Sequence, residues 1–192
     1  MKPLPFAWPH AVLFWAVFLW AFQPELGLVR RAERSQTPSD AKSLQVIMLG
    51  QSVAFFASFW LAWVPALQFT HRSAAFYGGL ATIVAGSLLR RHCFRMLGAS
   101  FTGDVRAHAS QQVVSRGAYR ILRHPSYTAG IMLNAGAGIA LGSWASAILM
   151  IAGSTAAYLY RMAVEERTLS AVIGEPYREF MRTRKRLIPF VY

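Results

Sequence analysis

The sequence predicts an all-α integral membrane protein with about five transmembrane helices. Hydrophobic residues make up 55% of its 192 residues, and 15% are charged, whereas soluble domains carry about 25% charged residues. The charges are also segregated, because four long stretches contain no Lys, Arg, Asp or Glu: 3–24, 43–71, 73–89 and 124–160. A transmembrane helix needs about 20 apolar residues, so these stretches are the candidate spans.

The first three uncharged stretches each predict one helix. We expect the first from about Trp8 to Phe22, the second from about Leu44 to Ala66, and the third from Ser73 to about Arg91. The first stretch differs from a cleaved signal peptide, because its start is weakly charged and no A-x-A-like site follows it. We therefore expect it to be retained as a helix.

The fourth stretch holds 37 residues, which is too long for one helix. Gly142-Ser143 lies near its middle and suits a tight turn. The sequence therefore predicts a hairpin of two antiparallel helices, Ser126–Leu141 and Trp144–Tyr160. The alternative is one tilted, kinked helix, which would need a bilayer well above the usual thickness of about 30 Å.

The distribution of basic residues predicts an orientation. With five spans in place, 18 of the 20 Lys and Arg residues lie on one side, and only Lys2 and Arg72 lie on the other. The positive-inside rule places the basic side in the cytoplasm and the N-terminus outside. All eight Asp and Glu residues share the basic side, so we expect the net charge of +12 to face anionic lipid headgroups and not nucleic acid.

The region beyond the hairpin is expected to be cytoplasmic and helical. The fifth helix continues until Gly174 and Pro176 stop it, and a shorter basic, amphipathic segment follows. We divide the chain into 1–104, with the first three transmembrane helices and a cytoplasmic loop, and 105–192, the candidate catalytic and cofactor-binding region, which contains the hairpin at 126–160. Cys93 is the single cysteine, and the five histidines lack ligand spacing, so no metal site is predicted.

Two polar clusters flank the hairpin. An antiparallel hairpin brings its two ends together, so clusters some 40 residues apart in sequence should become neighbours on the cytoplasmic face. Carboxylates, arginines and aromatic faces together suit a small zwitterionic ligand. The first cluster contains Gln111, Tyr119, Arg123, His124 and Tyr127, and the second contains Glu165, Glu166, Tyr177 and Phe180.

Structural roles compete with this interpretation. Arg123 has the position of an arginine that reaches lipid phosphate at the membrane boundary. Tyr119 and Tyr127 could belong to an aromatic belt. Glu165 and Glu166 could pair with arginines on the same exposed helix face. Spacing alone leaves these roles and the binding site as alternatives.

The two clusters also carry a family resemblance. The runs QQVVSRGAYR (111–120) and RHPSY (123–127), followed by Glu165-Glu166, Leu169, Gly174, Tyr177 and Ile188-Pro189, resemble the signature of isoprenylcysteine carboxyl methyltransferases and related phospholipid methyltransferases. The resemblance covers about residues 105–190. It implies methyl transfer from S-adenosylmethionine at the membrane surface, with the cytoplasmic C-terminal helices forming the cofactor pocket and a lipid-like or prenylated acceptor entering from the membrane.

The resemblance also implies residue roles. Arg123 is expected to orient the acceptor, and Glu166 to fix Arg123 or the cofactor amine. The cofactor pocket is expected to contain Gln111, Val113, Gly117, Tyr119, His124, Pro125, Tyr127, Glu165, Leu169 and Tyr177.

The chain departs from the family pattern at three positions. Gln111 replaces a histidine, Ala129 stands where glycine is expected, and Phe180 replaces a tyrosine. Because glutamine cannot titrate, Gln111 can hydrogen-bond a cofactor but cannot act as a base. We expect these departures to affect the identity of the acceptor more than the binding of the cofactor.

The acceptor has alternatives. A carboxylate is already ionised and needs no base, whereas a phospholipid amine would need deprotonation by Glu165 or Glu166 with a raised pKa. A small thiol is a further candidate. A protein of another class, which binds lipid or a partner without catalysis, also remains an alternative.

Overall fold

The computed structural model describes residues 2–33, 38–98 and 113–188. Within these ranges it describes the side chains of all residues except those in 26–47. Within these ranges the chain forms six α-helices, joined in places by short 3-10 turns. The predicted all-α class is confirmed. The helices are α1 (His10–Glu33), α2 (Pro38–Ala62), α3 (Arg72–Leu97), α4 (Pro125–Ala140), α5 (Trp144–Val172) and α6 (Glu175–Thr183).

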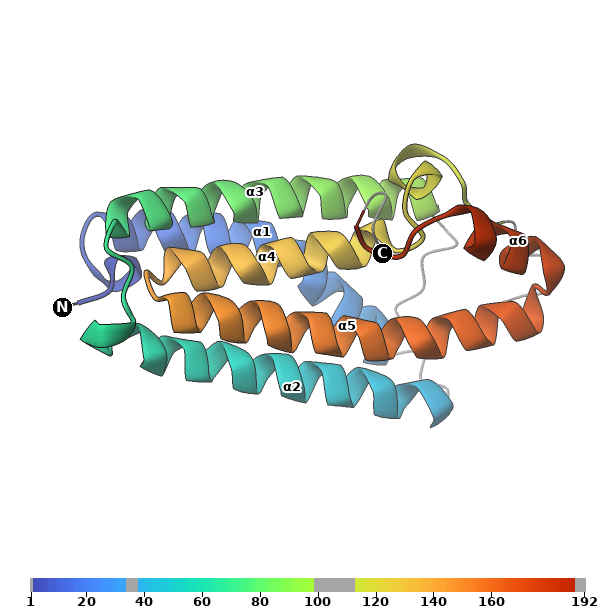
Figure 1. Cartoon of the computed structure of the whole chain (residues 1–192), viewed down its shortest axis with the longest axis horizontal. Coiled ribbons are helices and arrows are strands. Elements are labelled where there is room, and N and C mark those ends of the chain that lie inside the picture. The colour runs from blue at the N-terminus through green and yellow to red at the C-terminus, as the bar shows by residue number, and fades with distance from the viewer. Residues whose placement is uncertain (1, 34–37, 99–112, 189–192) are drawn as a thin grey trace.

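Five long helices run side by side in an elongated bundle (Figure 1). Helix α4 lies between α3 and α5, and α2 flanks α5 on the far side from α4. The short α6 lies beyond one end of the bundle, next to the C-terminal part of α5. The buried core joins α1, α3, α4 and α5, and its fully buried members include Phe14, Phe76, Ile83, Leu133 and Met150.

The predicted hairpin is confirmed. Helix α4 ends at Ala140 and α5 begins at Trp144. Gly142 has a φ of 81°, a conformation that glycine adopts without steric cost. Ser143 then caps α5, because its hydroxyl oxygen accepts a hydrogen bond from the Ser146 amide. As expected, α5 continues beyond residue 160 and stops just before Gly174.

By length and composition alone, α5 is the one helix of the described ranges that qualifies as a membrane span. The other four predicted spans also form helices, but the described part of each does not meet that test. Helix α4 has 16 residues, and α3 contains three glycines and ends in three arginines. In α2 the described side chains give a shorter apolar part, Met48–Ala62, because those before Met48 lie outside the described residues. The test therefore bears out one span, and the count of five stays a prediction.

Paired glycines lie where α3 crosses α4. A Cβ added to Gly79 would lie 2.6 Å from the Gly136 carbonyl oxygen, and one added to Gly136 would lie 2.7 Å from the Gly79 oxygen. The two backbones therefore touch at paired glycines. Small residues at close helix crossings are typical of helix packing in membranes.

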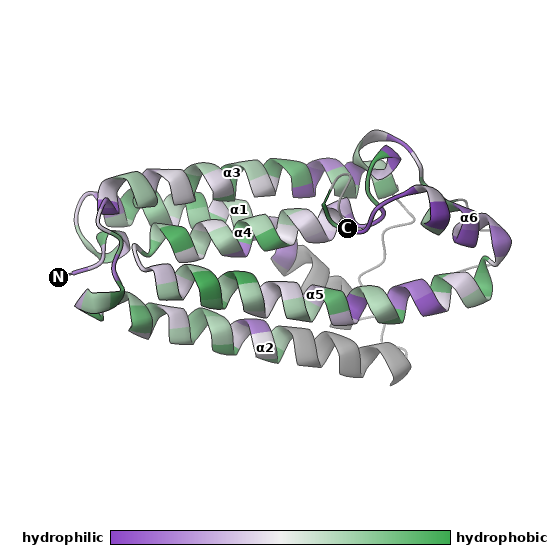
Figure 2. Ribbon diagram, in the orientation of Figure 1, coloured by the Kyte–Doolittle hydropathy of each residue, from purple (hydrophilic) through white to green (hydrophobic). Residues whose placement is uncertain are grey.

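Polarity changes along the bundle. Hydrophobic residues dominate its length, whereas hydrophilic residues gather at α6, the neighbouring part of α5 and the adjoining end of α3 (Figure 2). The candidate site lies at this polar end.

Candidate functional site

The RHP run forms the turn that starts α4. His124 is the residue before the helix, with φ −125° and ψ 54°, and Pro125 is the first helical residue. Proline fits this position because its missing N–H has no partner in the first turn of a helix. The turn therefore places Arg123 and His124 just outside α4, at the polar end of the bundle.

The C-terminal segment runs alongside this turn. The amide of Arg123 donates to the Lys185 carbonyl at 2.7 Å, and the amide of His124 donates to the Arg186 carbonyl at 3.1 Å. Thr128 Oγ1 also donates to the Leu187 carbonyl at 2.8 Å. The last described residues are thus tied to the start of α4.

Glu166 lies at the centre of a buried ionic cluster. Its side chain is 7% exposed. Its Oε1 lies 3.0 Å from His124 Nε2 and 3.4 Å from Arg123 Nη1, and its Oε2 lies 2.9 Å from Arg186 Nη2. Burial alone would raise the pKa of Glu166, but the hydrogen bond and charges of His124, together with the two arginines, lower it below its usual value. Glu166 is therefore an ionised carboxylate.

Glu165 binds the other side of the same turn. The Tyr127 hydroxyl donates to Glu165 Oε2 at 2.6 Å, and His124 Nδ1 lies 3.8 Å from the same oxygen. The rings of His124 and Tyr127 stack with centroids 5.4 Å apart, and Tyr127 stacks on Tyr158 at 4.9 Å. The two clusters on either side of the hairpin thus meet, as the topology predicted.

Two more predicted tyrosines are buried near the carboxylates. Burial raises the pKa of Tyr177, and the nearby charges of Glu165 and Glu166 raise it further. Burial also raises the pKa of Tyr119. Both phenols therefore stay protonated at neutral pH. The ring of Phe180 lies 6.0 Å from that of Tyr177. Phe180, which stands where the family pattern has a tyrosine, therefore packs beside Tyr177 without offering a second hydroxyl.

The remaining predicted residues lie around the cluster. Pro125 is buried, and Val113 and Leu169 are half-buried and supply only apolar side chains. Gly117 has a φ of 59°, and a Cβ there would lie 2.9 Å from His92 Nε2, so this turn packs against α3 and not against Glu166. Gln111 lies outside the described residues.

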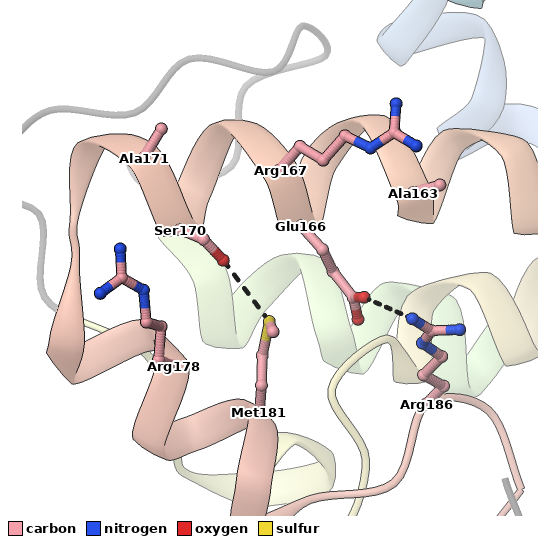
Figure 3. A pocket seen from close by; sticks show the side chains of 8 residues that line it. All are labelled: Ala163, Glu166, Arg167, Ser170, Ala171, Arg178, Met181 and Arg186. Carbon is pink, nitrogen blue, oxygen red and sulfur yellow. Dashed lines mark hydrogen bonds and ion pairs between the residues drawn. The ribbon is translucent and has the colours of Figure 1, made fainter.

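An open hollow of about 550 Å³ lies between α5 and α6, beside the cluster. Glu166 and Arg186 close one side of it through their hydrogen bond, and Ser170 and Met181 face each other across its middle (Figure 3). This volume is typical of small-molecule sites. Among the predicted site residues that the structure describes, only Glu166 lines it. The lining residues are Ala163, Glu166, Arg167, Ser170, Ala171, Arg178, Met181 and Arg186.

Arg186 is the member of the cluster that sequence reasoning missed. It belongs to a basic run in which Arg182, Arg184 and Lys185 look equivalent. Its contact with Glu166 depends on how the C-terminal segment lies beside residues 122–128. Its place two residues before the matching Ile188-Pro189 pair was the available signal.

Curated relatives with similar sequences are isoprenylcysteine methyltransferases. Protein-S-isoprenylcysteine O-methyltransferase B of Arabidopsis thaliana is 30% identical over 115 residues, which cover 59% of this chain and 58% of the relative. A probable protein-S-isoprenylcysteine O-methyltransferase of Oryza sativa subsp. indica is 26% identical over 117 residues, covering 60% of this chain and 61% of the relative. The matched region thus spans about three fifths of these relatives.

A solved structure shares the fold. The eukaryotic intramembrane Ras methyltransferase ICMT (isoprenylcysteine carboxyl methyltransferase) superposes with a TM-score of 0.64 at 23% identity, covering 73% of this chain and 52% of that chain. The family model for phospholipid methyltransferases matches residues 74–175, which is 102 of the 192 residues. This region includes α4, α5 and most of α3, together with both carboxylates of the cluster. The chain therefore belongs to the phospholipid methyltransferase family.

Proposed function

We propose that this methyltransferase uses S-adenosylmethionine to methylate the carboxylate of a prenylcysteine-like acceptor at the cytoplasmic membrane face. The observation that carries the proposal is the buried carboxylate of Glu166, held between Arg123, His124 and Arg186 beside an open hollow. Family membership indicates methyl transfer as the reaction. The ionised state of Glu166 favours an acceptor that does not need to lose a proton.

The residues around the hollow fit the cofactor chemically. S-adenosylmethionine carries an ammonium, a sulfonium and a carboxylate, and when bound it supplies the methyl group. Glu166 lines the hollow and would hold a cationic group of the cofactor. Glu165 and Tyr177 lie outside this lining, so a cationic contact of Glu165 and an aromatic contact of Tyr177 with the sulfonium stay predictions. Arg178 and Arg186 line the hollow and would bind the carboxylate.

The state of Glu166 argues against an acceptor that must lose a proton. A general base works best with a pKa near the operating pH, whereas the cationic neighbours of Glu166 hold its pKa below the usual value. A carboxylate acceptor is ionised already. Arg123 would orient it, since the buried Nε of Arg123 has no hydrogen-bond partner among the described residues. Methyl transfer would then depend mainly on alignment of the reacting groups, since proximity and orientation can lower an activation barrier by about 7–11 kcal/mol.

We place the active site on the cytoplasmic side of a five-span protein, with a lipid-like acceptor entering sideways from the membrane. The 18 basic residues on one predicted side support this orientation. The outer face of α2 supports contact with lipid, because large apolar side chains at helical spacing are highly exposed there. They are Leu49, Val53, Phe56 and Trp60, at 60–80% exposure.

Two measurements test the proposal. Calorimetry with S-adenosylhomocysteine in detergent should detect binding to the folded protein, and membranes given methyl-labelled cofactor should form a base-labile methyl ester on a prenylcysteine analogue. Arg123→Ala should abolish transfer, because the acceptor loses its orienting group. Arg182→Ala is the matched control, because Arg182 is 66% exposed on α6 and pairs only with Glu175 and Glu179 among the contacts described for it.

The outcomes separate the alternatives. Label that appears in phospholipid headgroups and not in the prenylcysteine would replace the carboxylate acceptor with an amine. A folded protein that fails to bind the cofactor product at millimolar concentration would contradict every methyltransferase assignment.

A further inference from the structure

A second ion pair lies inside the bundle, away from the Glu166 cluster. Arg90 of α3 binds Glu25 of α1 in a two-pronged contact: Nε to Oε1 at 2.6 Å and Nη2 to Oε2 at 2.9 Å. Arg90 is 4% exposed. Its guanidinium therefore points into the protein.

The same guanidinium reaches the start of α4. Arg90 Nη1 donates to the carbonyl of Ser126 at 2.5 Å, and Ser126 lies between His124 and Tyr127 in sequence. The guanidinium also lies over the ring of Phe94 at 4.8 Å, and its carbon is 6.0 Å from the centroid of Tyr158, the ring on which Tyr127 stacks. Arg90 thus contacts the RHPSY turn in two ways. It donates a hydrogen bond to the Ser126 carbonyl, and it lies near Tyr158, the ring on which Tyr127 stacks.

Stability alone does not explain such a pair. Two charges lose their hydration when buried, and replacing a buried ion pair with neutral residues is often neutral or stabilising. What an apolar pair cannot supply is a directed hydrogen bond to the Ser126 carbonyl. The planar guanidinium can bind a carboxylate in two places and still donate elsewhere.

We infer that the Glu25–Arg90 pair positions the catalytic turn: Glu25 fixes the guanidinium of Arg90, and Arg90 fixes the first turn of α4. This inference rests on the proposed function for its activity readout. Arg90 is a positioning residue, because its described contacts are with Glu25, the Ser126 carbonyl and aromatic rings. His124 and Tyr127 hold the two carboxylates, so a shift of this turn moves both sides of the site.

The test removes both charges together. The double variant Glu25→Gln/Arg90→Gln leaves no uncompensated buried charge, so the bundle should still fold, whereas each single Gln variant risks unfolding it. We expect kcat to fall about 10- to 100-fold, because displacement of reacting groups by about 1 Å has effects of this size. The acceptor KM should stay within about twofold. Arg90→Lys should recover part of the rate, since lysine can still donate to the Ser126 carbonyl.

Arg91→Gln is the matched control. Arg91 is the next residue on α3, and it binds the Trp20 carbonyl at 2.8 Å and lies over the Trp20 ring. Its described contacts are with α1 and Ser87 of its own helix, so kcat should be unchanged. A folded double variant with the kcat of the control would overturn the inference.

Amide hydrogen exchange provides a readout that needs no acceptor. In the double variant, exchange of the peptide 123–130 should become faster, while exchange of 144–156 in the neighbouring α5 should not change. Equal exchange at 123–130 in the double variant and wild type would also overturn the inference. If the wild type transfers no methyl group but the exchange result holds, then the proposed function fails and the positioning role of the pair stands.

Discussion

At the residue scale, Glu166 is the centre of the site. Its carboxylate, on α5, binds residues from two other parts of the chain: Arg123 and His124 before α4, and Arg186 after α6. Because the burial of a carboxylate is unfavourable unless it is paired, these partners hold its charge in place. One ionised side chain therefore links the segments that surround the hollow.

The charge of Glu166 predicts a pH dependence of stability. A carboxylate whose folded pKa is lowered stabilises the protein above its unfolded pKa, here 4.5, and that stabilisation is lost as pH falls through the folded pKa. Glu166→Gln should therefore lower the melting temperature in detergent at pH 7, and the difference from wild type should shrink below about pH 4.5. Glu175→Gln is the control, because Glu175 is 61% exposed and should change stability by about 0–1 kcal/mol. A difference that stays constant from pH 7 to pH 3.5 would contradict the role of the charge.

At the element scale, the paired glycines of α3 and α4 set the distance between these helices. A Cβ on Gly79 would meet backbone and Cβ atoms of α4, with Ala140 Cβ at 2.7 Å. A Cβ added to Gly78, the preceding residue, would have no neighbouring atom within 4 Å. Helix α4, which starts at the RHPSY turn, therefore packs closely against α3 because neither glycine has a side chain.

These neighbouring glycines make a matched pair of variants. Gly79→Ala should destabilise the protein by about 1–3 kcal/mol, because the backbones must move apart. Gly78→Ala should stabilise it by about 0.5–1 kcal/mol, because alanine favours the helix and meets no neighbour. Chemical denaturation of both variants in mixed micelles measures the difference. Equal effects of the two substitutions would show that the close crossing does not constrain α3 and α4.

At the scale of the whole molecule, polar and apolar regions are separated along the bundle (Figure 2). Four of the five exposed tryptophans, Trp8, Trp60, Trp63 and Trp144, lie near the helix ends remote from α6, whereas Trp20 lies against Arg91. Tryptophan is enriched at membrane interfaces, so this end is a candidate for the outer boundary of the bilayer. The ionic cluster and the hollow belong to the opposite end.

Cysteine labelling tests this orientation. His71→Cys should react with a membrane-impermeant maleimide only from outside, because His71 is exposed in the loop before α3. Glu179→Cys should react only from the cytoplasmic side, because Glu179 is exposed on α6. The natural Cys93 is buried, so the unmodified chain serves as the background. Labelling of both positions from the same side would exclude five spans.

The sequence by itself determined the helical class and the hairpin. An uncharged stretch of 37 residues with Gly142-Ser143 at its middle permits few folds, because backbone in lipid must be helical. The hairpin then dictates that residues 123–127 and 165–166 meet, so most of the candidate site followed from order along the chain. The motifs on either side of the hairpin also indicated the family, and the family match over residues 74–175 confirms it.

The tertiary structure alone decided which charges pair. Arg186 differs from its basic neighbours only in where the C-terminal segment places it beside the RHPSY turn. Arg90 and Glu25 are 65 residues apart, and hydropathy marks both merely as charges at helix ends. Periodicity reports which face of a helix is apolar, but the partner of a buried charge depends on the packing of two helices. For α1 and α3 that packing includes contacts such as the Ser87 hydroxyl with the Ala21 carbonyl, which a single sequence does not reveal.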